Sequence, residues 1–510
     1  MKAYEALAAH IAEYNDLLNI LNTLKWDMRA KMPAGGSRSR GAQLETLSKL
    51  AKDMFVSDRT ARLLDAAEEE SARVELDIYQ ARALQQTRRY YEIQRRIPAD
   101  LIGRIAALSP ESETVWAQAK DQNDFAAFKP YLRRMLDFNI ELAEAIGYDE
   151  HPFDALIFQF EPGMTAASLG ALFAQLKAGI LPLLEKIVAE DAPLPLDLWE
   201  REYDIDSQER LCREFAALIG FDFGRGRLDI APHPFEVSFT RDDVRITTRY
   251  DSKYLPMSLF AALHEAGHGL YEQNVSPSLT RSALTTDFLG QYAVGGASYG
   301  AHEFSSRLWE NQIGRSRAFW KLHFGRLRDS FPEQMGSADA ELVYRAVNRV
   351  RPSLIRVEAD EVTYNLHIML RTEIEMALLD SSITVDELPE VWKAKMVEYL
   401  GLSPPDDRRG VLQDVHWSAG TFANFPCYTI GNIMAAQVFE AARAHVPDLD
   451  QKLAMGDYGS LLDWLTEAIY RHGRAYTVKE LLQSATGGDL RVAPLLTYLE
   501  RKYSDLYSLN

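Results

Sequence analysis

The stretch FAALHEAGHGLYEQN, residues 260–274, places two histidines four residues apart, with a glutamate directly after the first. On an α-helix, residues four apart lie above one another, so the rings of His264 and His268 project from one face. Two neutral imidazoles so placed can hold one metal ion, typically zinc, and Glu265 can act as general base towards a water on that metal. The alternative is a surface helix with coincidental histidines. The pattern favours the H-E-x-x-H helix of a zinc hydrolase.

A catalytic zinc site needs a third protein ligand and an open position for water. The spacing typical of metzincins is excluded, because Asn274 stands where their third histidine would lie. The next expected helix offers either His302 or Glu303, but not both, since adjacent residues diverge by about 100°. Arg307 occupies the position where thermolysin-like enzymes have an aspartate. We favour Glu303 as the third ligand and keep His302 as the alternative.

Helical periodicity dominates the rest of the chain. Apolar residues recur at helical spacing from Tyr4 to Leu21, and a long solvated helix is expected over residues 71–97, ended by Pro98. AGGSRSRG, residues 34–41, is expected to be a short loop. Further helices are expected over residues 164–189, 206–219, 259–273, 299–313, 353–379, 385–400, 429–445, 458–472 and 492–507.

One interval breaks the helical pattern. Residues 227–250, RLDIAPHPFEVSFTRDDVRITTRY, carry β-branched and aromatic residues in short alternation, which predicts two or three short strands with turns at 231–234 and 241–243. The strands lead directly into the metal helix, so we expect a small β-sheet beside it. No internal repeat or long linker stands out. We expect a mostly α fold, one domain over residues 1–510 folded around a cleft, with two lobes flanking that cleft as the alternative.

Composition limits the compartment and the partners. The net charge of −18 argues against nucleic acid and anionic membranes as partners. Two cysteines cannot form a disulfide framework and fit a reducing compartment. The first residues have no basic start followed by an apolar run, and no long uninterrupted apolar run occurs, so we expect neither a signal peptide nor a membrane span. The expectation is a cytoplasmic protein.

Seven ordered stretches, spread over essentially the whole chain, resemble the carboxypeptidase Taq family of metallocarboxypeptidases. They are LKWDMRAKMPAGGSRSRGAQ (24–43), HPF (233–235), DVRIT (243–247), HEAGH (264–268), HEFSS (302–306), RPSLIRVEADEVTYNLHIMLR (351–371) and GVLQDVHW (410–417). The resemblance implies a gluzincin-like zincin with an almost all-α fold around a long central active-site groove, often a homodimer.

Position by position, the resemblance makes His264, His268 and Glu303 the metal ligands and Glu265 the general base. It implies one zinc ion per chain, for which cobalt can substitute. Two stretches depart from the family pattern. Phe304 and Ser305 replace the small residue and glutamine that usually follow the glutamate, and FANFPCY (422–428) departs from the family's F-G-Y-F-P-T-Y but keeps its final tyrosine.

Peptide hydrolysis also needs donors for the developing oxyanion. We assign that role to His416 and Tyr428, which lie in one compact segment. For the terminal carboxylate of a peptide we expect an arginine, because its fork of donors matches two oxygens. Arg356 is the first choice, with Asp360 one turn on to orient it, and Arg245 is the second.

These inferences combine into one expected function. The chain is expected to be a zinc-dependent carboxypeptidase that releases single residues from the free C-termini of peptides by means of a metal-activated water. One alternative is a metal-dependent oligopeptidase of the same fold. Another is a non-catalytic helical scaffold that binds peptides and carries a structural metal, against which the presence of Glu265 argues.

Overall fold

The computed structural model describes residues 1–190, 198–199, 201–289 and 295–509. The chain divides into two compact units. The first unit comprises Met1–Gln94, Leu194–Val347 and Gly431–Leu490, and the second comprises Arg95–Pro193, Asn348–Ile430 and Arg491–Asn510. The mostly helical fold with a small sheet is confirmed. The single domain and its central groove stay predictions.

The first unit contains the sheet and most of the helices. Its helices are α1 (Lys2–Ala30), α2 (Ser37–Phe55), α3 (Asp58–Ser71), α4 (Ile78–Arg96), α9 (Ile205–Leu218), α10 (Leu255–Gln273), α11 (Tyr299–Arg307), α12 (Arg317–Ser330), α13 (Pro332–Met335), α14 (Ala340–Val347), α17 (Pro426–His445), α18 (Leu449–Ala454), α19 (Gly459–Ala468) and α20 (Val478–Thr486). The ends of α4 and α17 extend into the second unit. A π-helical segment, η4 (Leu308–Gly314), continues α11 directly.

The described residues of the second unit form helices and connecting turns, with no strand. Its helices are α5 (Ala99–Gln122), α6 (Phe125–Ile146), α7 (Pro152–Ile157), α8 (Ala166–Glu190), α15 (Tyr364–Leu379), α16 (Leu388–Leu400) and α21 (Ala493–Tyr507). Short 3-10 turns occur in both units, at Ala34–Gly36, Pro277–Leu279, Ala283–Thr285, Arg356–Glu358 and Tyr470–His472.

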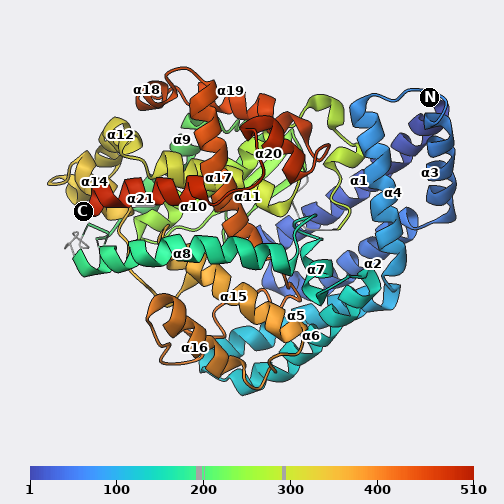
Figure 1. The fold of residues 1–510 in the computed structure, drawn as a ribbon, viewed down its shortest axis with the longest axis horizontal. Helices are drawn as coiled ribbons and strands as arrows, with labels where there is room; N and C mark the ends of the chain where they lie inside the picture. The colour runs from blue at the N-terminus through green and yellow to red at the C-terminus, as the bar shows by residue number, and fades with distance from the viewer. Residues whose placement is uncertain (191–197, 200, 290–294, 510) are drawn as a thin grey trace. The chain divides into compact units, whose positions relative to one another are not determined.

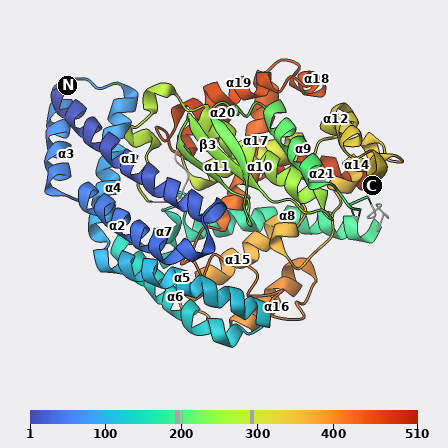
Figure 2. The same ribbon diagram turned by 180° about the vertical axis from the view of Figure 1, so that it is seen from behind.

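The predicted strands form one small sheet. They are β1 (Gly226–Ile230), β2 (Glu236–Thr240) and β3 (Asp243–Thr248), in the order β1-β3-β2, with β1 parallel and β2 antiparallel to β3. On one face, Val237 and Phe239 pack with Trp26 of α1 in a buried apolar cluster. The opposite face lies against α10, as Figure 2 shows. The sheet therefore fixes the position of the helix that carries the H-E-x-x-H motif.

Helix α10 is buried almost along its whole length. It begins with Pro256 in its first turn, where proline's missing N–H costs nothing. It packs against β3, α9 and α11 (Figure 1), and a helix apolar on nearly all sides is typical of such a position. Gly269 faces the sheet, because a Cβ there would lie 2.5 Å from Phe221 and 3.3 Å from Val244. Close packing on every side leaves the two histidines little freedom.

Three expectations about helix boundaries are wrong. The long helix over 71–97 is broken between α3 and α4, because Asp77 and Gln80 cap each other's backbone N–H at the start of α4 (2.9 and 3.1 Å). The expected loop at 34–41 is a 3-10 turn followed by the first turns of α2. The helix expected from residue 353 begins only at Tyr364, because the Asp360 carboxylate accepts the backbone N–H of Val362 and Thr363 in a turn.

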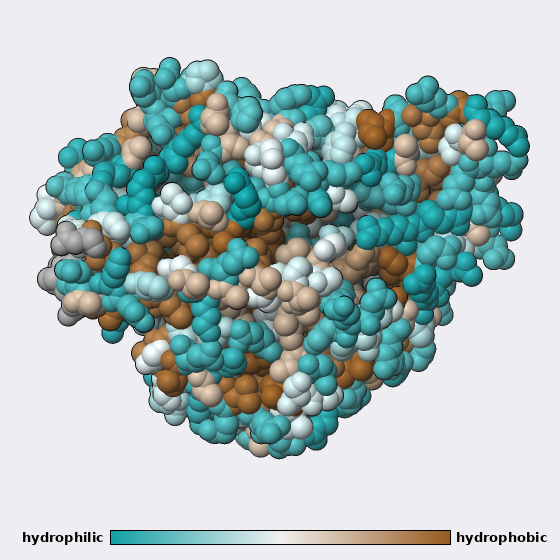
Figure 3. All heavy atoms as spheres, viewed as in Figure 1, coloured by the Kyte–Doolittle hydropathy of each residue, from teal (hydrophilic) through white to brown (hydrophobic). Residues whose placement is uncertain are grey.

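Helix α8 is the one helix in the described ranges that is long and apolar enough to cross a membrane by length and composition, and 33% of its most apolar window is buried. It runs beside α21 in Figure 1, and apolar residues show in Figure 3 where α8 lies. Its buried stripe includes Leu169, Phe173, Leu176 and Ile180. A core helix of a folded unit presents the same stripe, so length and composition alone assign no membrane span.

Candidate active site

Helices α10 and α11 approach each other at Gly267. A Cβ on Gly267 would lie 2.6 Å from the Cα of Ser306 and 2.9 Å from the carbonyl oxygen of Ser305, so the approach requires glycine. The Ser305 hydroxyl lies 2.6 Å from the carbonyl oxygen of Gly267 and 2.7 Å from the hydroxyl of Tyr470. Ser305, which departs from the family pattern, therefore links α11 to α10. The other departure, Phe304, is buried, and its ring lies 6.3 Å from that of Tyr271 on α10 between centroids.

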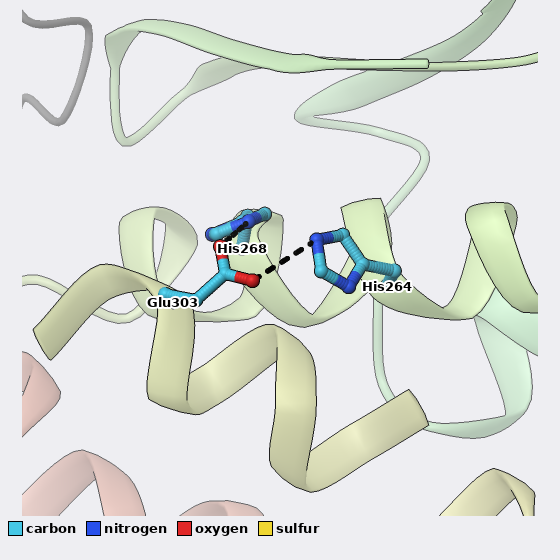
Figure 4. Close-up of side chains that lie close together, drawn as sticks. All are labelled: His264, His268 and Glu303. Carbon is cyan, nitrogen blue, oxygen red and sulfur yellow. Dashed lines mark ion pairs between the residues drawn. The ribbon is translucent and has the colours of Figure 1, made fainter. Parts of the chain in front are cut away.

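The approach brings His264, His268 and Glu303 together (Figure 4). Their potential ligand atoms all lie within 4.8 Å of one another, and they form the one such group of His, Cys, Asp or Glu found in the described part of the chain. The Glu303 carboxylate lies between the two rings, 3.8 Å from Nε2 of His264 and 3.3 Å from Nε2 of His268. Two imidazole nitrogens and one carboxylate oxygen are a donor set that suits zinc.

The surroundings favour the metal-binding ionisation states of Glu303 and His268, whereas the Glu303 and Glu310 carboxylates raise the pKa of His264 in spite of its burial. Burial would raise the pKa of Glu303, but the charges of Arg307 and His264 outweigh it and hold that pKa at about 2. Burial lowers the pKa of His268 to about 3, so its ring is neutral at pH 7. A carboxylate and a neutral imidazole are the forms that bind metal.

Glu265 differs from Glu303 in its electrostatics. It is buried on α10, and burial raises its pKa to about 7. A carboxyl group with a pKa near neutrality can both accept and return a proton in this range. This behaviour is what a general base in hydrolysis requires.

His302, the alternative third ligand, points elsewhere. Its Nε2 lies 2.9 Å from the Glu272 carboxylate, and its ring stacks on His268 at 4.5 Å between centroids. The structure therefore brings Glu303, and not His302, to the pair of histidines.

One residue of this site was missed from the sequence. Glu310, in the π-helical segment, lies 2.9 Å from Nδ1 of His264. The spacing in the sequence could have indicated this residue. Glu310 follows Glu303 by seven residues, and two turns of an α-helix bring a side chain back to nearly the same face.

Arg356, the predicted carboxylate ligand, lies in the second unit and is 6% exposed. The expectation that Asp360 orients it is wrong, since Asp360 binds backbone N–H groups and the Thr363 hydroxyl. Asp414 takes that role instead, binding Nε of Arg356 at 2.9 Å and Nε of Arg371 at 2.7 Å. Asp414 lies in the stretch QDVHW, which the sequence analysis singled out. No pattern in the sequence indicated that Asp414 pairs with Arg356.

His416 and Tyr428, also in the second unit, lie next to each other. Nε2 of His416 is 3.2 Å from the hydroxyl of Tyr428, and the His416 ring packs on Phe425 at 4.4 Å between centroids. The Arg356 guanidinium lies 5.4 Å from the centre of the Tyr428 ring. Arg356, His416 and Tyr428 thus form one cluster of polar groups within this unit.

Arg245, the second choice for the carboxylate, has other partners. On β3 it forms a bidentate ion pair with Asp243, in which Nε and Nη2 of Arg245 each donate to one carboxylate oxygen at 2.9 Å. Its guanidinium also lies 4.4 Å from the centre of the Trp26 ring. The structure gives Arg245 a bracing position between the sheet and α1.

An H-E-x-x-H helix that receives a glutamate from the following helix is the donor arrangement of a metallopeptidase. The carboxypeptidase Taq (M32) metallopeptidase family matches residues 6–503, and the chain belongs to this family. Carboxypeptidase 1 of Bacillus subtilis (strain 168) is 36% identical over 100% of this chain and 99% of its own length. Thermostable carboxypeptidase 1 of Thermus thermophilus is 37% identical over 99% of each chain.

Solved structures agree in fold. The crystal structure of an M32 carboxypeptidase from Deinococcus radiodurans R1 has a TM-score of 0.94 and 39% identity, covering 100% of both chains. The structure of Pyrococcus furiosus carboxypeptidase has a TM-score of 0.93 and 32% identity over 99% of each chain. The predicted family and enzyme class, a metallocarboxypeptidase, are therefore confirmed.

Proposed function

We propose that the metal is one zinc ion per chain, held by His264, His268 and Glu303, with cobalt able to substitute. The observation that carries this proposal is the group of three ligand atoms within 4.8 Å of one another, on two helices that cannot move apart easily. Three protein ligands leave a position open for water, as catalytic zinc sites require. A structural site would instead be closed by a fourth ligand.

Bound zinc supplies a Lewis acid that activates water and polarises the scissile carbonyl. Glu265 accepts the proton of the attacking water and returns it to the leaving amine, a role that its pKa of about 7 supports. Neutral His268 and ionised Glu303 keep their ligand atoms free of protons for the metal.

We assign oxyanion stabilisation to His416 and Tyr428. Their mutual contact at 3.2 Å keeps both polar ends in one place. Phe425 supports the His416 ring, so little reorganisation accompanies the reaction.

Charge supports Arg356 as the residue that binds the C-terminal carboxylate. The two guanidinium groups of Arg356 and Arg371 share the single carboxylate of Asp414, which leaves a net charge of about +1 on these three side chains. Burial raises the pKa of nearby Glu375 to about 8, so it contributes little negative charge at pH 7. The C-terminal carboxylate of a bound peptide would neutralise this excess positive charge. Arg245 is already satisfied by Asp243 and is the weaker candidate.

We also propose that the substrates are peptides with a free C-terminus, and that the enzyme is a cytoplasmic homodimer that binds neither nucleic acid nor membranes. Both cysteines, Cys212 and Cys427, are buried free thiols, which fits a reducing compartment. The homodimer rests on the family resemblance.

Product analysis tests this function. One peptide is prepared with a free and with an amidated C-terminus, and each is incubated with zinc-loaded and metal-depleted enzyme. Mass spectrometry should show stepwise loss of single residues from the free acid, with zinc only. Internal cleavage, or equal cleavage of the amide, would indicate an oligopeptidase instead.

A further inference from the structure

The two histidines of the metal site have different surroundings on their second nitrogen. Nδ1 of His264 lies 2.9 Å from an oxygen of Glu310. Nδ1 of His268 is buried and has no hydrogen-bond partner among the residues that the structure describes. Metal-bound histidines usually donate this second N–H to a carboxylate, a carbonyl or water, and the partner fixes the tautomer and ring orientation. Of these two histidines, His264 has such a side-chain partner among the residues that the structure describes, and His268 does not.

Glu310 is itself held firmly. Arg315 donates to its other carboxylate oxygen at 3.0 Å, and Arg307 lies 3.5 Å from the oxygen that faces His264. Arg307 also donates to Oε1 of Glu303 at 2.7 Å, so one guanidinium bridges the third ligand and Glu310. The position of Glu310 is thus determined from two sides before any metal binds.

Glu310 lies in the π-helical segment that continues α11. The sequence predicts an uninterrupted α-helix over 299–313, but the helix changes to π geometry at Leu308. Such segments occur frequently at functional sites. Its last residue, Gly314, packs against α10, where a Cβ would lie 2.7 Å from Leu263, the neighbour of His264. The segment therefore lies close against α10 beside the ligand that it supports.

We propose that Glu310 is a positioning residue of the metal centre: it accepts the Nδ1–H of His264 and so keeps the lone pair of Nε2 directed towards the metal. This inference rests on the proposed ligand set. With Nδ1 protonated and bound, Nε2 is the nitrogen that faces Glu303, at 3.8 Å from its carboxylate. The carboxylate of Glu310 also increases the basicity of the His264 ring. His268 relies on burial and on its stacking with His302.

The test compares Glu310→Gln with a control, Glu361→Gln. Both substitutions remove a carboxylate that is largely shielded from solvent, but the partners of Glu361 are Lys502 at 2.7 Å and Tyr503 at 3.0 Å, which neither belong to the ligand set nor contact it. Zinc dissociation constants of the full-length protein are measured by competition with a chromophoric chelator, and the visible spectrum of the cobalt form reports the ligand field.

We expect Glu310→Gln to weaken zinc binding roughly 10- to 100-fold, the usual loss for such a partner, and to shift the cobalt spectrum. Glu361→Gln should leave both unchanged. If Glu310→Gln does not fold, Glu310→Asp replaces it, since the shorter side chain cannot keep the contact with Nδ1. Wild-type zinc affinity in the Glu310 variant, or an equal loss in both variants, overturns the proposal.

His264→Ala separates this inference from the proposed function. If His264→Ala binds zinc as tightly as wild type, the ligand set is wrong and the role of Glu310 falls with it. If His264→Ala loses zinc while Glu310→Gln does not, the ligand set stands and only the positioning role is refuted.

Discussion

Replacing Gly431 with alanine tests how closely the third ligand is confined. Gly431 lies on α17, and a Cβ at this position would lie 2.5 Å from Cγ and 2.7 Å from Cβ of Glu303. Contacts below 3.0 Å essentially never occur for real Cβ atoms, so either the Glu303 side chain or α17 must move. Because Glu303 is also fixed by Arg307 at 2.7 Å, its carboxylate cannot move without losing that bond.

The expected change in folding stability is small, whereas the expected loss of zinc affinity is large enough to measure. Overpacking costs about 1–3 kcal/mol, and alanine in place of glycine within a helix returns about 0.5–1 kcal/mol, so the fold should survive. The affinity for zinc should fall at least about 10-fold, as it does when a ligand loses its support. Gly170→Ala is the matched control, because it is a glycine within α8 where an added Cβ meets nothing within 4 Å.

The assay is zinc titration of both metal-depleted variants, with thermal unfolding to confirm that each is folded. Gly170→Ala should bind zinc as wild type does. A folded Gly431→Ala with wild-type affinity would refute the reasoning, because it would mean that displacing Glu303 does not matter to the metal.

Further predictions concern the third ligand, the carboxylate site and pH. Glu303→Ala should weaken zinc binding far more than His302→Ala, and a titration with the opposite order would reverse the assignment. Arg356→Ala should lose roughly 2–4 kcal/mol of transition-state stabilisation in kcat/KM on free-acid peptides and change little on amidated ones; equal losses would indicate a purely structural role. Burial lowers the pKa of His323 to about 4, below its unfolded value of about 6.5, so its stabilising contribution is present above pH 6.5 and is lost as pH falls. In urea unfolding, the stability of wild type relative to His323→Gln should therefore fall by about 2 kcal/mol between pH 7 and pH 5, and a constant difference would contradict this.

The sequence predicted the sheet and the metal helix well because local patterns determine them. Alternation over 227–250 and helical spacing over 259–273 each reflect burial of one element against its direct neighbours. The spacing of His264 and His268 follows from helix geometry alone. The following helix narrowed the third ligand to His302 or Glu303, and the structure brings Glu303 to the two histidines.

The sequence could not show contacts made by side chains over long separations. Asp414 lies 58 residues from Arg356, and no local pattern distinguishes this pairing from the expected one with Asp360. The break before α4 depended on a reciprocal cap between Asp77 and Gln80, a short signal within a strongly helical stretch. The π-helical segment likewise depends on packing against α10, which periodicity does not report.

Glu265→Gln provides the most direct test of the central claim that a carboxylate next to the metal drives hydrolysis. The variant is loaded with zinc, its metal content is measured, and its rate of residue release is compared with that of wild type. We predict one zinc per chain and a rate at least about 100-fold lower, because the amide cannot accept the proton of water. A zinc-loaded variant that releases residues at nearly the wild-type rate would contradict the assignment of Glu265 as the general base.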